Sequence, residues 1–187
     1  MSAELVRISK FLSLVLRHQP EAIGLALNEQ GWADVDELIR LANNQRQPLT
    51  RELLERVVAE NDKQRFALSD DGRQIRASQG HSIEVDLHLP PLEPPEILYH
   101  GTASRFLDSI RATGLNSASR QHVHLSLDAV TATKVGQRHG PSVILKVRAK
   151  EMFSAGHQFF LSANGVWLTE VVPVQYLEFP AAKGSAT

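Results

Sequence analysis

Arginine and histidine side chains occur in short polar strings separated by ordinary globular sequence. Arg17 and His18 stand together where a helical pattern meets Pro20, and Arg76 lies in a second string. Guanidinium groups bind phosphate oxygens in pairs and stay charged at neutral pH, so these strings could orient a phosphate without a metal. A structural role is the alternative, because Arg and His also stabilise the C-terminal end of a helix dipole, and residues 73–82 could form a solvated hairpin and loop.

A second set of candidates is rich in histidine. His100, Gly101 and Thr102 follow one another at the end of an expected strand, where a glycine permits close approach of a polar ligand. His122 and His124 share one face of another expected strand, so they could bind a metal, but no third ligand stands at a diagnostic spacing. These histidines could equally be hydrogen-bonded parts of the framework.

Several other kinds of active site are excluded or unsupported. The chain has no cysteine, which excludes thiolate nucleophiles, disulfides and cysteine-bound zinc. It contains no glycine-rich dinucleotide fingerprint, Walker phosphate loop or nucleophile elbow, and no spaced carboxylate pair typical of glycosidases. The remaining chemistry is that of arginine, histidine and hydroxyl groups.

The charge balance limits the kind of anion that the protein can bind. Among 187 residues, 20 are Lys or Arg and 21 are Asp or Glu, for a net charge of -1. Broad nucleic-acid surfaces need an excess of cations, so any anion site must be local.

The composition predicts a soluble globular protein, and the lack of a signal peptide or membrane-length apolar run predicts a cytoplasmic location without a membrane partner.

A proline-rich segment between Leu89 and Glu96 predicts a linker between two domains. Before it, helical periodicity predicts helices over 5–16 and 35–42 and a third capped by Thr50, followed by a hairpin pairing 65–68 with 74–77. Three helices and a hairpin indicate a winged helix.

The second half predicts a compact mixed α+β domain of short strands and helices. Helices are expected over 105–113, ended by Gly114 in the left-handed helical conformation, and over 129–137, capped by Asp128. The expected strands cover 97–99, 122–125, 143–147, 158–161 and 166–169, and the last two flank an Asn164-Gly165 turn.

Six motifs in order along the chain resemble the NAD-dependent RNA 2′-phosphotransferase family. They are Ser13-Leu14-Val15-Leu16-Arg17-His18-Gln19-Pro20, Gly31-Trp32-Ala33, Ile75-Arg76-Ala77-Ser78-Gln79-Gly80-His81-Ser82, Leu98-Tyr99-His100-Gly101-Thr102, His122-Val123-His124-Leu125-Ser126 and Gly165-Val166-Trp167-Leu168-Thr169.

The resemblance implies an α+β protein with a winged-helix lobe over 1–89, which contributes residues that bind the RNA phosphate. A proline-rich linker follows over 90–96, an NAD-binding lobe of the ADP-ribosyltransferase type over 97–180, and a flexible tail over 181–187. It implies removal of the internal 2′-phosphate from tRNA splice junctions through an ADP-ribosylated RNA intermediate. The products are 2′-hydroxyl RNA, nicotinamide and ADP-ribose 1″,2″-cyclic phosphate. NAD is the co-substrate, no metal is needed, and we expect a monomer.

The resemblance also assigns roles to residues. It places the family's catalytic constellation on Arg17, His18, Arg76 and Arg138, with RNA contacts at Arg65, Gln79 and His81. NAD would be held by His100, Gly101, Thr102, His124 and Ser126. Glu170 is expected to be structural, because an ionised phosphate nucleophile needs no base.

Two other functions are kept as alternatives. The first is a winged-helix regulator that senses a ligand, although the acidic residues in 51–62 suit a DNA groove poorly. The second is an ADP-ribosyltransferase that modifies terminal phosphates of RNA or DNA.

Overall fold

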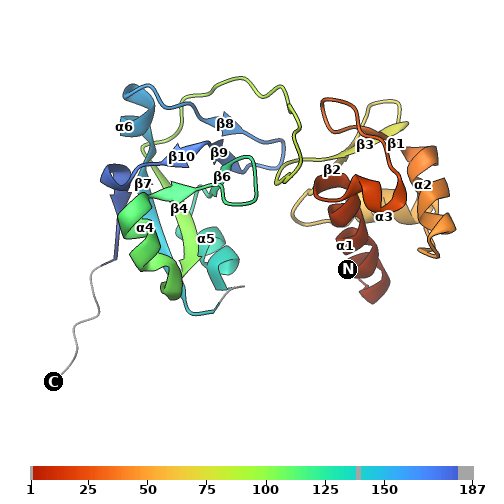
Figure 1. The fold of residues 1–187 in the computed structure, drawn as a ribbon, viewed down its shortest axis with the longest axis horizontal. Helices are drawn as coiled ribbons and strands as arrows, with labels where there is room; N and C mark the ends of the chain where they lie inside the picture. Colours follow the sequence, from red (N-terminus) through yellow and green to blue (C-terminus); the bar gives the residue numbers. More distant parts are fainter. Residues whose placement is uncertain (1, 138–139, 181–187) are drawn as a thin grey trace. The chain divides into compact units, whose positions relative to one another are not determined.

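The structure, a computed structural model, describes residues 2–137 and 140–180. Figure 1 draws the chain, which divides into two compact units. Unit 1 contains Met1–Leu89 together with Ser119–Gln121, and unit 2 contains Pro90–Ala118 and His122–Thr187. Both units combine helices with small antiparallel sheets, so the predicted α+β class is confirmed.

Unit 1 is mainly helical. Its helices are α1 (Ala3–Arg17), the 3₁₀ helix η1 (Pro20–Ile23), α2 (Val35–Asn44) and α3 (Arg51–Ala59). The side chains of Ser2, Asp34 and Thr50 each accept a backbone N–H from the first turn of the helix that follows, which satisfies donors that the helix leaves free. Leu12 and Leu16 are fully buried, so the apolar stripe of α1 forms part of a core shared with the other helices.

A three-stranded sheet completes unit 1. Its strands are β1 (Ala33–Asp34), β2 (Phe66–Leu68) and β3 (Gln74–Ala77), in the order β1-β3-β2. Phe66 pairs with Ala77 and Ala33 with Ile75, and all four side chains are buried in the core. The predicted hairpin is therefore confirmed, whereas β1 is too short to leave a periodic signal.

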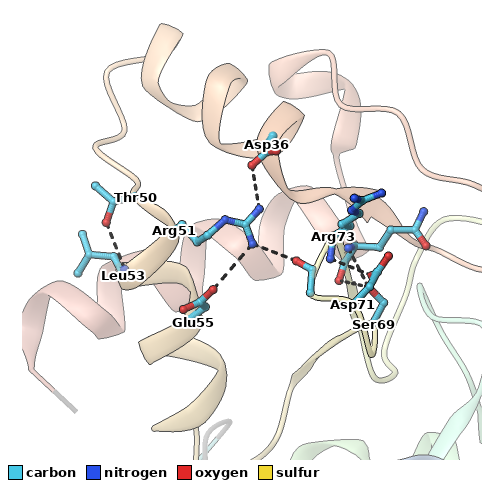
Figure 2. A network of polar contacts seen from close by, with 10 residues as sticks. Asp36, Thr50, Arg51, Leu53, Glu55, Ser69, Asp71 and Arg73 are labelled. Atoms are coloured by element: carbon cyan, nitrogen blue, oxygen red, sulfur yellow. Dashed lines mark hydrogen bonds and ion pairs between the residues drawn. The ribbon is translucent and has the colours of Figure 1, made fainter.

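Arg51 connects three segments of unit 1 (Figure 2). Its guanidinium lies 2.8 Å from Asp36 Oδ1 in α2, donates to the Gly72 carbonyl oxygen at 3.1 Å and lies 3.8 Å from Glu55 Oε1. Arg56 is similarly paired with Glu60 at 3.1 Å. Both arginines of α3 are thus paired with carboxylates of the same unit.

Unit 2 contains three small sheets and three α-helices within its described residues. The strands are β4 (Ile97–Ala103), β5 (Leu115–Asn116), β6 (Val123–Leu125), β7 (Ser142–Arg148), β8 (Phe160–Leu161), β9 (Trp167–Thr169), β10 (Val171–Val172) and β11 (Leu177–Glu178). The helices are η2 (Ser104–Phe106), α4 (Leu107–Thr113), α5 (Ala129–Gly136), α6 (Ala149–Ser154) and η4 (Val174–Tyr176).

The longest strand pair, β4 with β7, organises unit 2. β11 lies on the other edge of β7, β6, β9 and β8 form a second sheet, and β10 pairs with β5. An isolated bridge between Tyr99 and Ser126 links β4 to the end of β6, with backbone hydrogen bonds of 2.8 and 2.9 Å. A separate core that includes Leu98, Leu145 and Phe159 fills this unit.

Two glycines allow close packing in unit 2, and one of them corrects an expectation. A Cβ on Gly101 would lie 1.8 Å from the Ala132 carbonyl oxygen in α5, so the missing side chain lets this helix rest on β4. Gly114 ends α4 with φ 75° and ψ -164°, which is not the predicted left-handed helical conformation. A Cβ there would lie 2.3 Å from the Val172 carbonyl oxygen, so close backbone approach explains this glycine.

Other expectations about unit 2 also needed correction. β4 continues to Ala103 because β7 pairs with all seven of its residues, so His100, Gly101 and Thr102 lie within a strand and not at its end. Helix α6 was not predicted, since six residues give little periodic signal. The predicted turn at Asn164-Gly165 is confirmed, with β8 and β9 paired on either side and Gly165 at φ 77°.

Candidate active site

Unit 1 brings together four basic residues, Arg17, His18, Arg65 and Arg120, here called the basic cluster. Arg17 is the last residue of α1, and its Nη2 donates to the Arg65 carbonyl oxygen at 3.1 Å. Its guanidinium carbon also lies 5.8 Å from the centre of the Phe66 ring. Burial, followed by the charges of Arg65 and Arg120, lowers the pKa of Arg17 to about 10, so it remains a cation at pH 7.

The buried end of Arg17 has unused hydrogen-bonding capacity. Its Nε is buried and has no hydrogen-bond partner within the described part of the chain. Such an atom costs free energy unless something satisfies it, and a bound anion would do so.

Arg65 is hydrogen-bonded to the buried Asn61, which in turn contacts the buried Ser9. Its Nη1 donates to Asn61 Oδ1 at 3.4 Å, and Asn61 Nδ2 donates to Ser9 Oγ at the same distance. Asn61 and Ser9 are buried, and the Arg65 carbonyl oxygen also accepts the N–H of Ser78. The sequence analysis did not single out Asn61, because a buried Asn has no distinguishing local pattern.

His18 is tied to the loop that follows β3. Its Nδ1 is hydrogen-bonded to Ser82 Oγ at 2.9 Å, and the N–H of Ser82 donates to the Arg17 carbonyl oxygen at 2.9 Å. Partial burial, followed by the charges of Arg17 and Arg120, lowers the pKa of His18. The imidazole is therefore neutral at pH 7 and able to accept a proton.

Arg120 reaches the basic cluster from the second half of the sequence. Ser119–Gln121 belongs to unit 1, and the N–H of Gln121 donates to the His81 carbonyl oxygen at 3.1 Å. The charge of Arg120 acts on both Arg17 and His18. Sequence reasoning missed Arg120; its position two residues before the His122 motif was the one available signal.

The other expected phosphate and RNA residues have varied surroundings. Arg76 lies over the Trp32 ring, with 4.5 Å between its guanidinium carbon and the ring centre, and burial lowers its pKa. His81 is buried, and its carbonyl oxygen accepts the N–H of Gln121, the residue after Arg120. Gln79 is half-buried in the loop after β3. Arg138 lies outside the described residues.

Unit 2 places the histidine candidates on adjacent strands. His100 in β4 donates its Nδ1–H to the His124 carbonyl oxygen in β6 at 3.1 Å, because a carbonyl can only accept. Burial lowers the pKa of His100 despite this hydrogen bond, so Nε2 carries no proton at neutral pH and can accept a hydrogen bond. The Tyr99–Ser126 bridge brings Ser126 to the same place, and Thr102 is buried two residues farther along β4.

Burial lowers the pKa of His122, and the charge of Glu170, which is exposed after β9, opposes this shift only in part. The His122 ring meets Phe160 edge to face at 5.9 Å. Within residues 2–137 and 140–180, no group of three or more His, Asp or Glu side chains is placed to hold a metal ion.

Comparison with known proteins gives these two groups of residues a context. A family model described as "RNA 2'-phosphotransferase, Tpt1 / KptA family" matches residues 3–171. The chain belongs to this RNA 2′-phosphotransferase family. The match covers the basic cluster of unit 1 and the histidine strands of unit 2.

Individual relatives of this RNA 2′-phosphotransferase cover nearly the whole chain. Proteins named probable RNA 2′-phosphotransferase from Hahella chejuensis and Escherichia coli are 58% and 56% identical to it. The first alignment covers 95% of both chains, and the second covers 94% of this chain and 96% of the relative. The protein is therefore an enzyme of the transferase class. None of its described helices has the length and apolar character needed to span a membrane.

Proposed function

We propose that this enzyme removes an internal 2′-phosphate from RNA and uses NAD as co-substrate. The observation that carries the proposal is the basic cluster: Arg17 donates to the Arg65 carbonyl oxygen, hydrogen bonds to Ser82 and Asn61 hold His18 and Arg65, and the charge of Arg120 acts on Arg17 and His18. Several fixed guanidiniums, one of them with the buried Nε of Arg17 lacking a hydrogen-bond partner among the described residues, suit a phosphate dianion. Such an anion needs donors on several sides, which a single strand or helix does not provide.

In the reaction, an oxygen of the RNA 2′-phosphate attacks C1″ of the nicotinamide ribose and displaces nicotinamide. The 2″-hydroxyl of the resulting ADP-ribosylated RNA then attacks phosphorus, and the RNA 2′-oxygen leaves. This yields 2′-hydroxyl RNA and ADP-ribose 1″,2″-cyclic phosphate. The guanidiniums orient the phosphate first and then stabilise the charge that builds on it, while neutral His18 accepts the proton of the attacking hydroxyl and passes a proton to the RNA 2′-oxygen as it leaves.

The histidine strands of unit 2 offer a site that fits NAD. His100 is half-buried and neutral, with Nε2 as an acceptor, and the Thr102 and Ser126 side chains can both donate and accept. Ribose hydroxyls have the same dual character, so this donor set suits a nucleotide. We assign His100, Gly101 and Thr102 to the adenosine ribose and pyrophosphate, and His124 and Ser126 to the nicotinamide ribose.

The remaining finer assignments rest on the family resemblance and the element order. Unit 1, with three helices before the β2–β3 hairpin, is proposed to have the winged-helix fold, and unit 2 that of ADP-ribosyltransferases. Gln79 and His81 are assigned to RNA binding and Arg138 to phosphate binding. A tRNA splice junction is the proposed substrate, in the cytoplasm.

One assay tests the main proposal. Purified protein is incubated with an internally 2′-phosphorylated oligonucleotide, with and without NAD, and formation of 2′-hydroxyl RNA and of the cyclic phosphate is measured. We expect both products only with NAD, and removal of one fixed charge from the site in Arg120→Ala to slow their formation about 100-fold or more. Arg73→Ala removes an exposed arginine outside the cluster and should leave the rate unchanged. Persistence of the phosphate at every NAD concentration would contradict the proposal.

A DNA-binding regulator is disfavoured by the surface of α3. Arg51 and Arg56 are paired with Asp36, Glu55 and Glu60, as Figure 2 shows for Arg51. Cations neutralised in this way offer little attraction to DNA phosphates.

A further inference from the structure

We propose that Trp32 and Arg76 form a second RNA contact, which stacks the base of a nucleotide next to the one that carries the 2′-phosphate. This inference rests on the proposed function, because it names the part of the same RNA that this surface would bind. It gives Arg76 a role in binding the neighbouring nucleotide in place of a role at the reacting phosphate.

The sheet register places the two side chains together. Ala33 in β1 pairs with Ile75 in β3, and both are buried, so the residues before and after them lie opposite each other on the other face of the sheet. Trp32 and Arg76 occupy these positions, with 4.5 Å between the guanidinium carbon and the ring centre. The Arg76 side chain forms no hydrogen bond or ion pair with any described residue, so its five guanidinium N–H donors remain available.

Trp32 is held in place by a tight turn. The Asn28 side chain accepts the N–H groups of Gln30 and Trp32 at 3.0 and 2.9 Å, and the Asn28 N–H donates to the Trp32 carbonyl oxygen at 2.9 Å. Gly31 within this turn has φ 78°, and a Cβ there would lie 2.9 Å from Val85 Cγ1. With its backbone fixed in this way and its ring packed against Arg76, Trp32 loses little entropy when a ligand stacks against the pair.

The pair also lies close to the basic cluster. The hydrogen bond from Ser78 N–H to the Arg65 carbonyl oxygen extends the β2–β3 ladder by one residue beyond the Phe66–Ala77 pair. Arg76 is therefore the diagonal neighbour of Arg65 on the same face, a position about 7–8 Å away across a ladder. A nucleotide adjacent to one bound at Arg65 and Arg17 can reach such a position.

The chemistry of the pair favours an RNA base. Proteins that bind single-stranded RNA stack unpaired bases on aromatic rings and on guanidinium planes, where nearby cations also attract the backbone. Arg76 covers Trp32 and keeps its charge unneutralised, so the two together offer both a planar surface and donors for the adjoining phosphate.

The test compares RNA with and without the neighbouring base. Binding of short internally 2′-phosphorylated oligonucleotides is measured without NAD by fluorescence anisotropy, using RNAs that carry a base or an abasic sugar on either side of the phosphorylated nucleotide. The variants are Trp32→Leu and Arg76→Lys, the second of which keeps the charge but loses the planar group. Arg73→Lys, an exposed residue outside the cluster, makes the same chemical change and is the matched control.

We expect each test variant to weaken binding of the RNA with the complete set of bases by about 5- to 150-fold, the range for loss of one stacked base. The abasic RNA should bind wild type as weakly as the complete RNA binds the variants, with little further loss on mutation. Arg73→Lys should bind like wild type. Should Trp32→Leu fail to fold, Arg76→Lys and the two RNAs with wild type still give the answer.

Equal losses on complete and abasic RNA, or no loss at all, would overturn the inference and leave the Trp32–Arg76 pair as framework or as a surface for another partner. NAD-dependent product formation together with no base dependence would refute the inference while supporting the proposed function. Base-dependent binding without any product would support the stacking site while refuting the proposed reaction.

Discussion

At the scale of single residues, burial and then neighbouring positive charge lower the pKa of two members of the basic cluster, Arg17 and His18. Arg17 is half-buried and feels the charges of Arg65 and Arg120, and His18 is held neutral by partial burial and by the charges of Arg17 and Arg120. Assembling like charges is unfavourable in the free protein, and a bound phosphate relieves the repulsion. The cluster is thus prepared for an anion before the anion arrives.

The pKa of His18 offers a direct test of this field. Arg120→Gln removes one of the positive charges that disfavour imidazolium, so we expect the pKa of His18 to rise toward its ordinary value of 6.5. Titration of the His18 ring followed by NMR measures this change. A pKa that is unchanged in Arg120→Gln would show that Arg120 does not act on His18.

Ser82 is predicted to position His18. In Ser82→Ala the Nδ1 hydrogen bond of 2.9 Å is lost, and a net loss of about 1 kcal/mol would slow product formation about fivefold. Single-turnover kinetics should show this loss in the rate constant, with NAD affinity unchanged. Ser82→Thr keeps the hydroxyl and should recover most of the rate, whereas equal rates for the alanine and threonine variants would argue against positioning.

His100 should make stability depend on pH. Its folded-state pKa lies below the ordinary 6.5, so the unfolded chain takes up the proton first as the pH falls. The contribution of neutral His100 is therefore complete above about pH 6.5 and is lost progressively below it. Urea unfolding at several pH values should show a shallower decline from pH 7 to 5 in His100→Gln than in wild type. An equally steep decline would assign the dependence to other groups.

At the scale of elements, backbone packing explains residues that resemble ligand-binding residues. Gly101 stands in a motif with His100 and Thr102, yet its missing Cβ makes room for α5. Strand β4 therefore both supports α5 at Gly101 and carries His100 and Thr102 of the candidate NAD site. Local pattern could not separate the two roles, because the helix that requires the glycine lies about 30 residues farther along the chain.

This packing predicts an order of stability losses. Gly101→Ala puts a methyl group 1.8 Å from the Ala132 carbonyl oxygen, so α5 must move, and we expect a loss of about 3 kcal/mol or more. Gly136→Ala meets its nearest atoms at 3.0 and 3.1 Å across the same interface and should cost less, since alanine also favours the helix. Urea denaturation measures both. A Gly101→Ala variant as stable as Gly136→Ala would contradict this account.

At the scale of the whole molecule, the net charge of -1 coexists with a local group of cations. The two halves of the sequence each build a separate hydrophobic core, but the three residues Ser119–Gln121 belong to the first unit. Arg120 joins the basic cluster because this segment belongs to unit 1. The protein therefore has a concentrated phosphate site without the overall basic charge of a general RNA-binding protein.

RNA affinity should accordingly depend on the 2′-phosphate more than on RNA length. We expect lengthening a 2′-phosphorylated RNA from about 6 to about 20 nucleotides to change the dissociation constant less than threefold, with a log–log salt slope of about -2 for three cations on single-stranded RNA. Anisotropy titrations at several salt concentrations measure both. Tight binding to long RNA without the 2′-phosphate would contradict the prediction.

The sequence by itself determined the local elements, since caps such as Thr50, apolar periodicity such as that of α1 and the Asn164-Gly165 turn act over a few residues. It also predicted the α+β class, and the ordered motifs indicated the family. Only the tertiary structure brought Arg65 and Arg120 to Arg17 and stacked Arg76 on Trp32. These contacts join residues about 45 to 100 positions apart, and such closures are decided by the packing of a whole unit, which no local pattern records.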